Sequence, residues 1–317
     1  MKVKEIYQDY LEFLKLKDKI TTIKGIKYKF DKYVIPFFGE YDINGITEKD
    51  YIDFQLKIKN LNYSNSFNSQ IHTMVRNLFN YLNVMYNVDN IPNKIGSLLP
   101  NKKSTTREYS TWSKKEFKKF INKVDDPIYH AFFNLLFYTG LRKSEAMALK
   151  ISDFSNNCIA VNKSITKELY NGKRLLLSTK TGKNRTIKID TLLSLELKRL
   201  IKYYNKNYKN CNSNSFLFGC EQPLANTTLK RKKDYYCDLA GIKRIRIHDF
   251  RHSHATMLYN HKIKIKLIQE RLGHADISTT LNTYVHTNQR EEKKLIKMIN
   301  FLNWNLNRTK RCGFLIE

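Results

Sequence analysis

Apolar residues near the start of the chain recur every three or four positions, which is the spacing of an amphipathic helix. Tyr7, Tyr10, Leu11 and Leu14 follow this spacing, and residues 71–82 repeat it. No clear alternation of strand type interrupts this part of the chain. The pattern therefore predicts a helical domain over residues 1–95.

A second folding unit is expected after a linker at residues 96–110, where Gly, Pro, Asn, Lys, Ser and Thr replace the periodic pattern. Ser113 and Glu116 have the spacing of a capping box, in which each side chain binds the other residue's backbone N–H. A strongly apolar helix is predicted next, at about residues 128–138. It should end at Gly140, because glycine is the usual residue at a helix C-terminus.

Three short segments after this helix have the composition of β-strands: residues 158–165, 174–179 and 185–189. The last two flank the turn-like sequence Lys180-Thr-Gly-Lys-Asn184. The pattern predicts that these two segments form a hairpin with basic residues at its tip.

Helical periodicity returns at about Leu192 and dominates the rest of the chain. We expect the second unit to be one domain over residues 111–303, followed by a C-terminal tail at residues 304–317. The predicted fold class is mainly α with a small β-sheet (α+β).

Basic charge is concentrated in the second part of the chain. Residues 1–100 contain 14 Lys and Arg against 11 Asp and Glu, a net charge of +3, whereas residues 101–317 contain 43 against 18, a net of +25. A lysine-rich codon bias would act on both parts alike. The asymmetry therefore favours a polyanionic partner, and nucleic acid in particular.

Membrane and secretory functions are not expected. The most apolar stretch, residues 131–141, is too short to cross a bilayer, and the first nine residues contain no apolar core of a signal peptide. The five cysteines are odd in number, widely spaced and without a CxxC pair, which is typical of reduced thiols. The sequence predicts a cytoplasmic protein without disulfide bonds.

A metal site at His248, His252 or His254 is not favoured. No glutamate follows His248 as a zinc-protease motif requires, and no cysteine ligand is near. We expect no metal and no cofactor.

Four local patterns carry side chains suited to phosphate chemistry. They are an arginine after a glycine break with Glu145 three residues on, a lysine in the predicted hairpin, a His-x-x-Arg pair on one helix face, and a Gly-His followed by a tyrosine. Each alone has an ordinary interpretation, namely a surface ion pair, a solvated lysine, a buried histidine or a packed aromatic ring. In chain order, the side chains are Arg142, Lys180, His248 with Arg251, His274 and Tyr284.

This ordered series resembles the tyrosine recombinase (phage integrase) family. The motifs TGLR-x-SE, the KT hairpin, HDxRH-x-x-AT and LGH…TYxH appear in the family's order over residues 101–290, and residues 1–95 look like its helical core-binding domain. The resemblance implies a tyrosine recombinase catalytic domain that cleaves and rejoins duplex DNA through a 3′-phosphotyrosine intermediate.

The resemblance also implies a role for each residue. Tyr284 would be the nucleophile, Arg142 and Arg251 would bind the non-bridging phosphate oxygens, and His248 would assist proton transfer at the nucleophile. Lys180 would protonate the leaving 5′ oxygen, and His274 would donate a further hydrogen bond to the phosphate. Neither metal nor nucleotide is needed, because the phosphotyrosyl bond conserves the energy of the broken bond.

The biological role implied is integration or excision of a mobile element or phage. The expected partners are double-stranded DNA, three further copies of the chain in a homotetramer on paired sites, and an accessory directionality factor. The nucleoid of a bacterial cell is the expected place of action. The alternative of an Xer-type recombinase, which resolves replicon multimers, remains open. A type IB topoisomerase and a catalytically silent DNA-binding protein are less favoured, because the recombinase motifs are compactly spaced and all six side chains are present.

Overall fold

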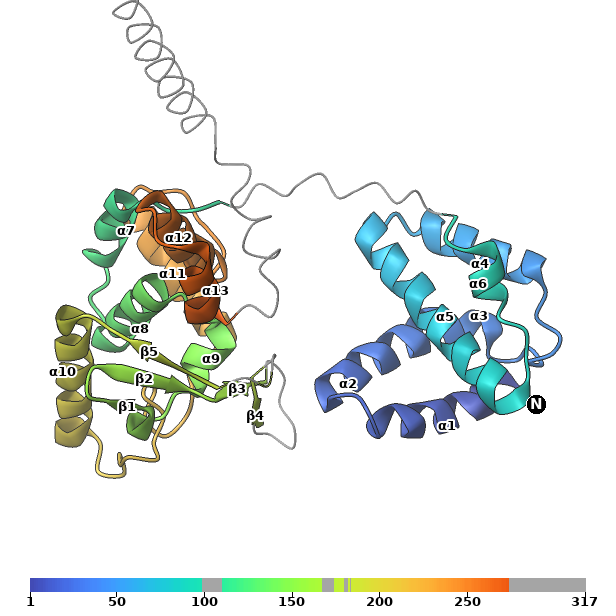
Figure 1. Ribbon diagram of the computed structural model, residues 1–317, viewed down its shortest axis with the longest axis horizontal. Helices are drawn as coiled ribbons and strands as arrows, with labels where there is room; N and C mark the ends of the chain where they lie inside the picture. The colour runs from blue at the N-terminus through green and yellow to red at the C-terminus, as the bar shows by residue number, and fades with distance from the viewer. Residues whose placement is uncertain (99–109, 167–173, 180–181, 183, 274–317) are drawn as a thin grey trace, which may run out of the picture. The chain divides into compact units, whose positions relative to one another are not determined.

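The computed structural model describes residues 1–98, 110–166, 174–179, 182 and 184–273. The chain divides into two compact units, residues 1–108 and 109–317, which are described separately. Figure 1 labels the helices and strands of both. Among the helices in the described part of the chain, none combines the length and the apolar character that a bilayer span requires.

The N-terminal unit is entirely helical in its described residues, as the periodicity predicted. Its core is rich in aromatic rings, among them Phe30, Phe38 and Phe54, which are almost fully buried. Thr47 and Ser64 are the N-caps of the helices that begin at Glu48 and Asn65, and each accepts a backbone N–H group. The elements are α1 (Val3–Lys15), α2 (Ile20–Lys29), the π-helical turn η1 (Phe30–Val34), α3 (Ile35–Phe38), α4 (Glu48–Asn60), α5 (Asn65–Tyr86) and α6 (Ile91–Ile95).

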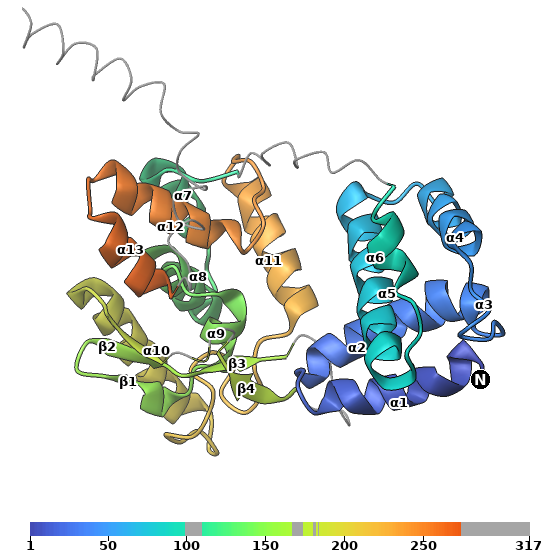
Figure 2. The same cartoon turned by 45° about the vertical axis from the view of Figure 1, so that its right-hand side comes forward.

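The second unit is built around one apolar helix, α8 (Pro127–Thr139), which packs against four other helices. Figure 2 shows this helix inside the unit. The predicted capping box begins α7, where Ser113 and Glu116 bind each other's backbone N–H groups. The other helices in the described residues of this unit are α7 (Lys114–Ile121), α9 (Lys143–Ala148), the 3-10 turn η2 (Ile151–Asp153), α10 (Thr191–Asn207), α11 (Asn226–Leu239), α12 (Asp249–Asn260) and α13 (Ile265–Leu272).

The described residues of this unit form two small antiparallel sheets. One has the strand order β1 (Phe154–Ser155), β2 (Cys158–Val161), β5 (Arg185–Lys188), and the other pairs β3 (Lys163–Ile165) with β4 (Leu176–Ser178). The mainly α fold with a small β component is therefore confirmed.

The predicted hairpin between residues 174–179 and 185–189 is wrong. β4 pairs with β3, and β5 pairs with β2, so the two segments lie in different sheets. Ser178 faces Lys163 and Arg185 faces Val161, so β4 and β5 run in the same direction along successive halves of one extended segment. β4 and β5 are therefore not the two strands of one hairpin.

Strand β1 was missed by the sequence analysis. It pairs with β2 through a two-residue turn in which Asn156 and Asn157 both have positive φ, 48° and 56°. Such turns favour Asn because its side chain tolerates the left-handed region. The Asn-Asn pair was the signal that could have revealed this hairpin.

Candidate active site

Arg142 stands at the junction between two helices, α8 and α9. Gly140 ends α8 in the left-handed conformation, and Arg142 is the N-cap of α9. The Nη1 of Arg142 donates to the Oε1 of Glu145 at 2.7 Å, and the backbone N–H of Arg142 donates to the Oε2 at 3.0 Å. Glu145 therefore holds both ends of Arg142, as its spacing predicted.

Glu145 is 1% exposed and is shared by a second arginine that the sequence analysis did not identify. Arg185 on β5 donates from Nη2 to the Oε2 of Glu145 at 2.6 Å and from Nη1 to the Oε1 at 3.2 Å. Burial alone would raise the pKa of Glu145, but the hydrogen bonds and charges of Arg185 and Arg142 hold it below its ordinary value. Glu145 is thus an ionised carboxylate that orients two guanidinium groups.

Arg251 and His248 approach the same junction from α12. Arg251 is 3% exposed, and its Nη1 donates to the carbonyl oxygen of Gly140 at 3.0 Å. His248 is the N-cap of α12. Burial, together with the positive charges of Arg251 and Arg142, lowers the pKa of His248. His248 is therefore neutral near pH 7 and able to accept a proton.

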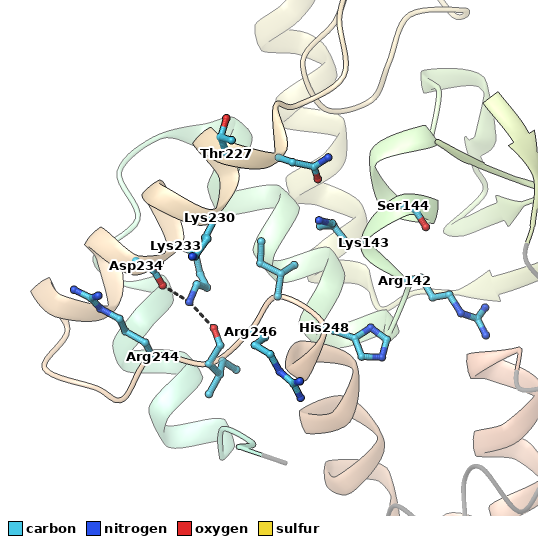
Figure 3. A pocket seen from close by; sticks show the side chains of 13 residues that line it. Arg142, Lys143, Ser144, Thr227, Lys230, Lys233, Asp234, Arg244, Arg246 and His248 are labelled. Carbon is cyan, nitrogen blue, oxygen red and sulfur yellow. Dashed lines mark hydrogen bonds and ion pairs between the residues drawn. The ribbon is translucent and has the colours of Figure 1, made fainter. Parts of the chain in front are cut away.

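A groove of about 840 Å³ opens beside this junction, between the start of α9, α11 and the segment that leads into α12. Figure 3 shows Arg142 and His248 at one end of the groove and the polar side chains of α11 along it. Basic side chains predominate over acidic ones on its walls. The lining residues are Arg142, Lys143, Ser144, Asn226, Thr227, Lys230, Lys233, Asp234, Arg244, Ile245, Arg246, Ile247 and His248.

The structure brings Arg142, His248 and Arg251 together, whereas Lys180, His274 and Tyr284 lie outside the described residues. The chain enters the undescribed C-terminal segment at Gly273, which ends α13. The carbonyl oxygen of Gly273 accepts a hydrogen bond from the Nη2 of Arg142 at 3.0 Å. The residue that precedes His274 is therefore in direct contact with Arg142.

His248 is the N-cap of α12, and His252 and His254 lie on the same helix. His254 is 1% exposed, its Nδ1 donates to the carbonyl oxygen of Phe137 at 2.8 Å, and its Nε2 accepts from Arg271 at 3.2 Å. Both ring nitrogens are thus occupied. The rings of His248 and His252 pack edge to face, with centroids 5.0 Å apart. Across the described ranges, no group of three or more His, Cys, Asp or Glu is arranged to hold a metal ion.

Gly140 is required by the close packing of this junction. Its φ is +67°, and a Cβ there would lie 2.6 Å from the Cδ2 of Leu272 and 2.7 Å from the Cδ2 of His254. We expect Gly140→Ala to lower the free energy of unfolding through about 1–2 kcal/mol of left-handed backbone strain and about 1–3 kcal/mol of overpacking. Urea denaturation measures the loss.

Gly241→Ala is the matched control, because Gly241 has a φ of +61° and open space where its Cβ would be. This variant should show the backbone strain without the overpacking. Equal losses in the two variants would contradict the view that α8, α12 and α13 meet tightly at Gly140.

Comparisons with known proteins agree on one family. Residues 110–291 match the model of the phage integrase family, and residues 2–59 match that of the phage integrase N-terminal SAM-like domain. The ICEBs1 integrase of Bacillus subtilis is 25% identical, over 90% of this chain and 79% of that protein. The tyrosine recombinase XerA of Pyrococcus furiosus is 28% identical, over 94% of this chain and 95% of that protein.

Solved structures share the fold. A structure of the Tn1549 transposon integrase in complex with a circular intermediate DNA aligns with a TM-score of 0.74 and 19% identity, covering 94% of this chain and 99% of that one. A lambda integrase dimer bound to a core site aligns with a TM-score of 0.63 and 14% identity, covering 89% and 95%.

Proposed function

The chain belongs to the phage integrase family and is a site-specific tyrosine recombinase, and from this premise we propose that it cuts and rejoins duplex DNA through a phosphotyrosine bond at Tyr284. The observation that carries the proposal is the pairing of Arg142 and Arg251 at one helix junction. Arg251 binds the carbonyl oxygen of Gly140, and Arg142 follows two residues later. Two planar guanidinium groups suit the two non-bridging oxygens of one phosphate.

In the proposed reaction, the phenol oxygen of Tyr284 forms a bond to phosphorus while the bond from phosphorus to the 5′ oxygen breaks. The phenol proton passes to His248, whose lowered pKa keeps it neutral beforehand. Lys180 gives a proton to the 5′ oxygen, and His274 donates a hydrogen bond to the phosphate. Rejoining reverses these steps with a 5′ hydroxyl of the partner strand, so no metal or nucleotide enters.

The charge on the phosphorane is offset by Arg142 and Arg251, which do not need to reorganise. Glu145 and the Gly140 carbonyl already fix their guanidinium groups before DNA binds. Fixed donors of this kind stabilise a transition state more than mobile ones do.

The proposal is tested by incubating the protein with a nicked suicide substrate. The substrate loses the 5′-hydroxyl fragment after cleavage, so the covalent adduct should accumulate and be visible on a denaturing gel. It should form equally in the presence of a chelator. An adduct that requires a divalent metal would point instead to different chemistry.

We propose integration and excision of a mobile element as the biological role, with double-stranded DNA as partner and the bacterial nucleoid as the place of action. Similarity to the ICEBs1 integrase and to the Tn1549 transposon integrase supports this role, while similarity to XerA keeps multimer resolution as the second candidate. The active assembly is proposed to be four chains on two sites, with an accessory protein setting direction. Mass measurement on a paired-site complex should give four chains, and an active monomer would favour a topoisomerase.

Residues 1–95 are proposed as the core-binding domain and residues 111–303 as the catalytic domain, with residues 96–110 as linker and residues 304–317 as tail. Because residues 101–317 carry a net +25 and residues 1–100 only +3, the DNA affinity should come mainly from the catalytic part. We expect log K to fall with log salt by about 0.9 for each phosphate contacted.

Titrating the full chain and a charge-reduced variant with labelled duplex at several salt concentrations measures this slope. Lys143→Gln with Lys230→Gln removes two charges from the groove and should make the slope shallower. Lys24→Gln with Lys49→Gln, on the N-terminal unit, is the control and should change it less. Equal changes in both variants would refute the claim that the charge asymmetry marks the DNA surface.

A further inference from the structure

Two helix C-termini meet beside Arg142, and arginine side chains bind the carbonyl oxygens of both. α8 ends at Gly140 and α13 ends at Gly273, each in the left-handed conformation. The last carbonyl groups of a helix lack partners within the helix and carry partial negative charge, so guanidinium groups bind them favourably.

Arg271 binds three elements at once. Its Nη2 donates to the carbonyl oxygen of Tyr138 in α8 at 3.0 Å, its Nη1 to that of Lys188 in β5 at 3.1 Å, and its Nε to the Nε2 of His254 in α12 at 3.2 Å. All three acceptors are neutral. Arg271 is partly buried, and this burial lowers the pKa of its guanidinium group. Arg271 therefore links α13 to α8, β5 and α12 by hydrogen bonds.

His254 is the acceptor that makes this arrangement specific. Burial, with the positive charge of Arg271, lowers the pKa of His254 to about 3, so the ring is neutral at pH 7. Its Nδ1 must carry the proton, because it donates to the carbonyl oxygen of Phe137. The Nε2 is consequently an acceptor, which only a donor such as the Nε of Arg271 can satisfy.

Two further arginines bind the backbone of the α13 terminus. The carbonyl oxygen of Arg271 accepts from the Nε of Arg185 at 3.1 Å, and that of Gly273 accepts from the Nη2 of Arg142. Arg185 and Arg142 are in turn paired with Glu145. The path from Glu145 to the end of α13 thus consists entirely of direct hydrogen bonds.

We propose that Arg271 is a positioning residue for strand cleavage, which rests on the proposed function. By fixing the end of α13 against α8 and β5, Arg271 places Gly273 on Arg142, and the next residue of the chain is His274. It thereby fixes Gly273, the point from which the chain continues to His274, beside Arg142. Arg271 does not line the groove and does not contact DNA in this role, so its loss should affect the chemical step and not the binding step.

The test is the rate of adduct formation on a nicked suicide substrate at saturating DNA, together with the DNA affinity. Arg271→Ala should slow adduct formation about a hundredfold, the usual consequence of a misplacement by roughly 1 Å, while the DNA affinity stays at the wild-type value. Arg271→Lys should also be slow, because one ammonium cannot reach three acceptors on three elements. Added guanidinium ion should partly restore the rate of Arg271→Ala and leave the wild type unchanged.

Lys266→Ala is the matched control, because Lys266 lies on the same helix in an exposed ion pair with Glu270. This variant should cleave DNA at the wild-type rate. Wild-type rates in both Arg271 variants would overturn the proposal. So would a parallel loss of DNA affinity, thermal stability and rate without rescue, since that is the result of a purely structural role. If Arg271→Ala does not fold, the same criteria apply to Arg271→Lys. Failure of the wild type itself to form an adduct would instead refute the proposed function.

Discussion

Tyr284→Phe should abolish the covalent protein–DNA adduct while folding and DNA binding survive. The substitution removes one oxygen and keeps the ring, so the packing changes little. A free tyrosine has a pKa of about 10, so only about a thousandth is ionised near neutrality, and the neighbouring groups must assist its attack. Without the phenol oxygen no bond to phosphorus forms. Denaturing gels of suicide-substrate reactions, with gel shifts for binding, measure both properties.

Tyr259→Phe is the appropriate control, because Tyr259 lies on α12, the helix that carries Arg251. This variant should form the adduct at the wild-type rate. Peptide mapping of the wild-type adduct should identify the residue joined to DNA. An adduct that persists in Tyr284→Phe, or that maps to another tyrosine, would overturn the assignment of the nucleophile.

Arg142→Ala and Arg251→Ala should each slow cleavage about a hundredfold or more. Loss of a fixed donor to the transition state raises the barrier by about 3 kcal/mol, which corresponds to this factor. Lysine should substitute poorly at either position, because an ammonium does not reproduce the planar pair of donors. The single-turnover cleavage rate at saturating DNA is the measurement.

The two variants should differ in stability. Arg142→Ala leaves Glu145 paired with Arg185, so the buried carboxylate keeps a partner and the domain should fold. Arg251→Ala removes a buried side chain and the donor to the Gly140 carbonyl, so a larger drop in Tm is expected. Arg199→Ala, at an exposed position of α10, should change neither rate nor Tm. Near wild-type cleavage by Arg142→Ala would contradict its assignment to the phosphate.

The sequence by itself determined the features that depend on near neighbours. It predicted the helix α8 and its end at Gly140, and the capping box of Ser113 and Glu116. It also predicted that Glu145 pairs with Arg142. These features were predictable because helical periodicity, caps and pairs three residues apart depend on interactions within one or two turns. The order of the motifs also identified the family, and the roles of Lys180, His274 and Tyr284 stay predictions.

Only the tertiary structure decided which distant segments meet. β4 and β5 looked like a hairpin because a turn-like sequence joins them, yet each pairs with a different half of the segment 158–165, since strand pairing depends on partners outside the local sequence. Arg185 reaches Glu145 across 40 residues, and Arg271 reaches Tyr138 across 133. An arginine in a strand or at a helix end has no local pattern that distinguishes it from a solvated one. Its role becomes visible only when the fold has placed it, partly buried, beside carbonyl groups that need a donor.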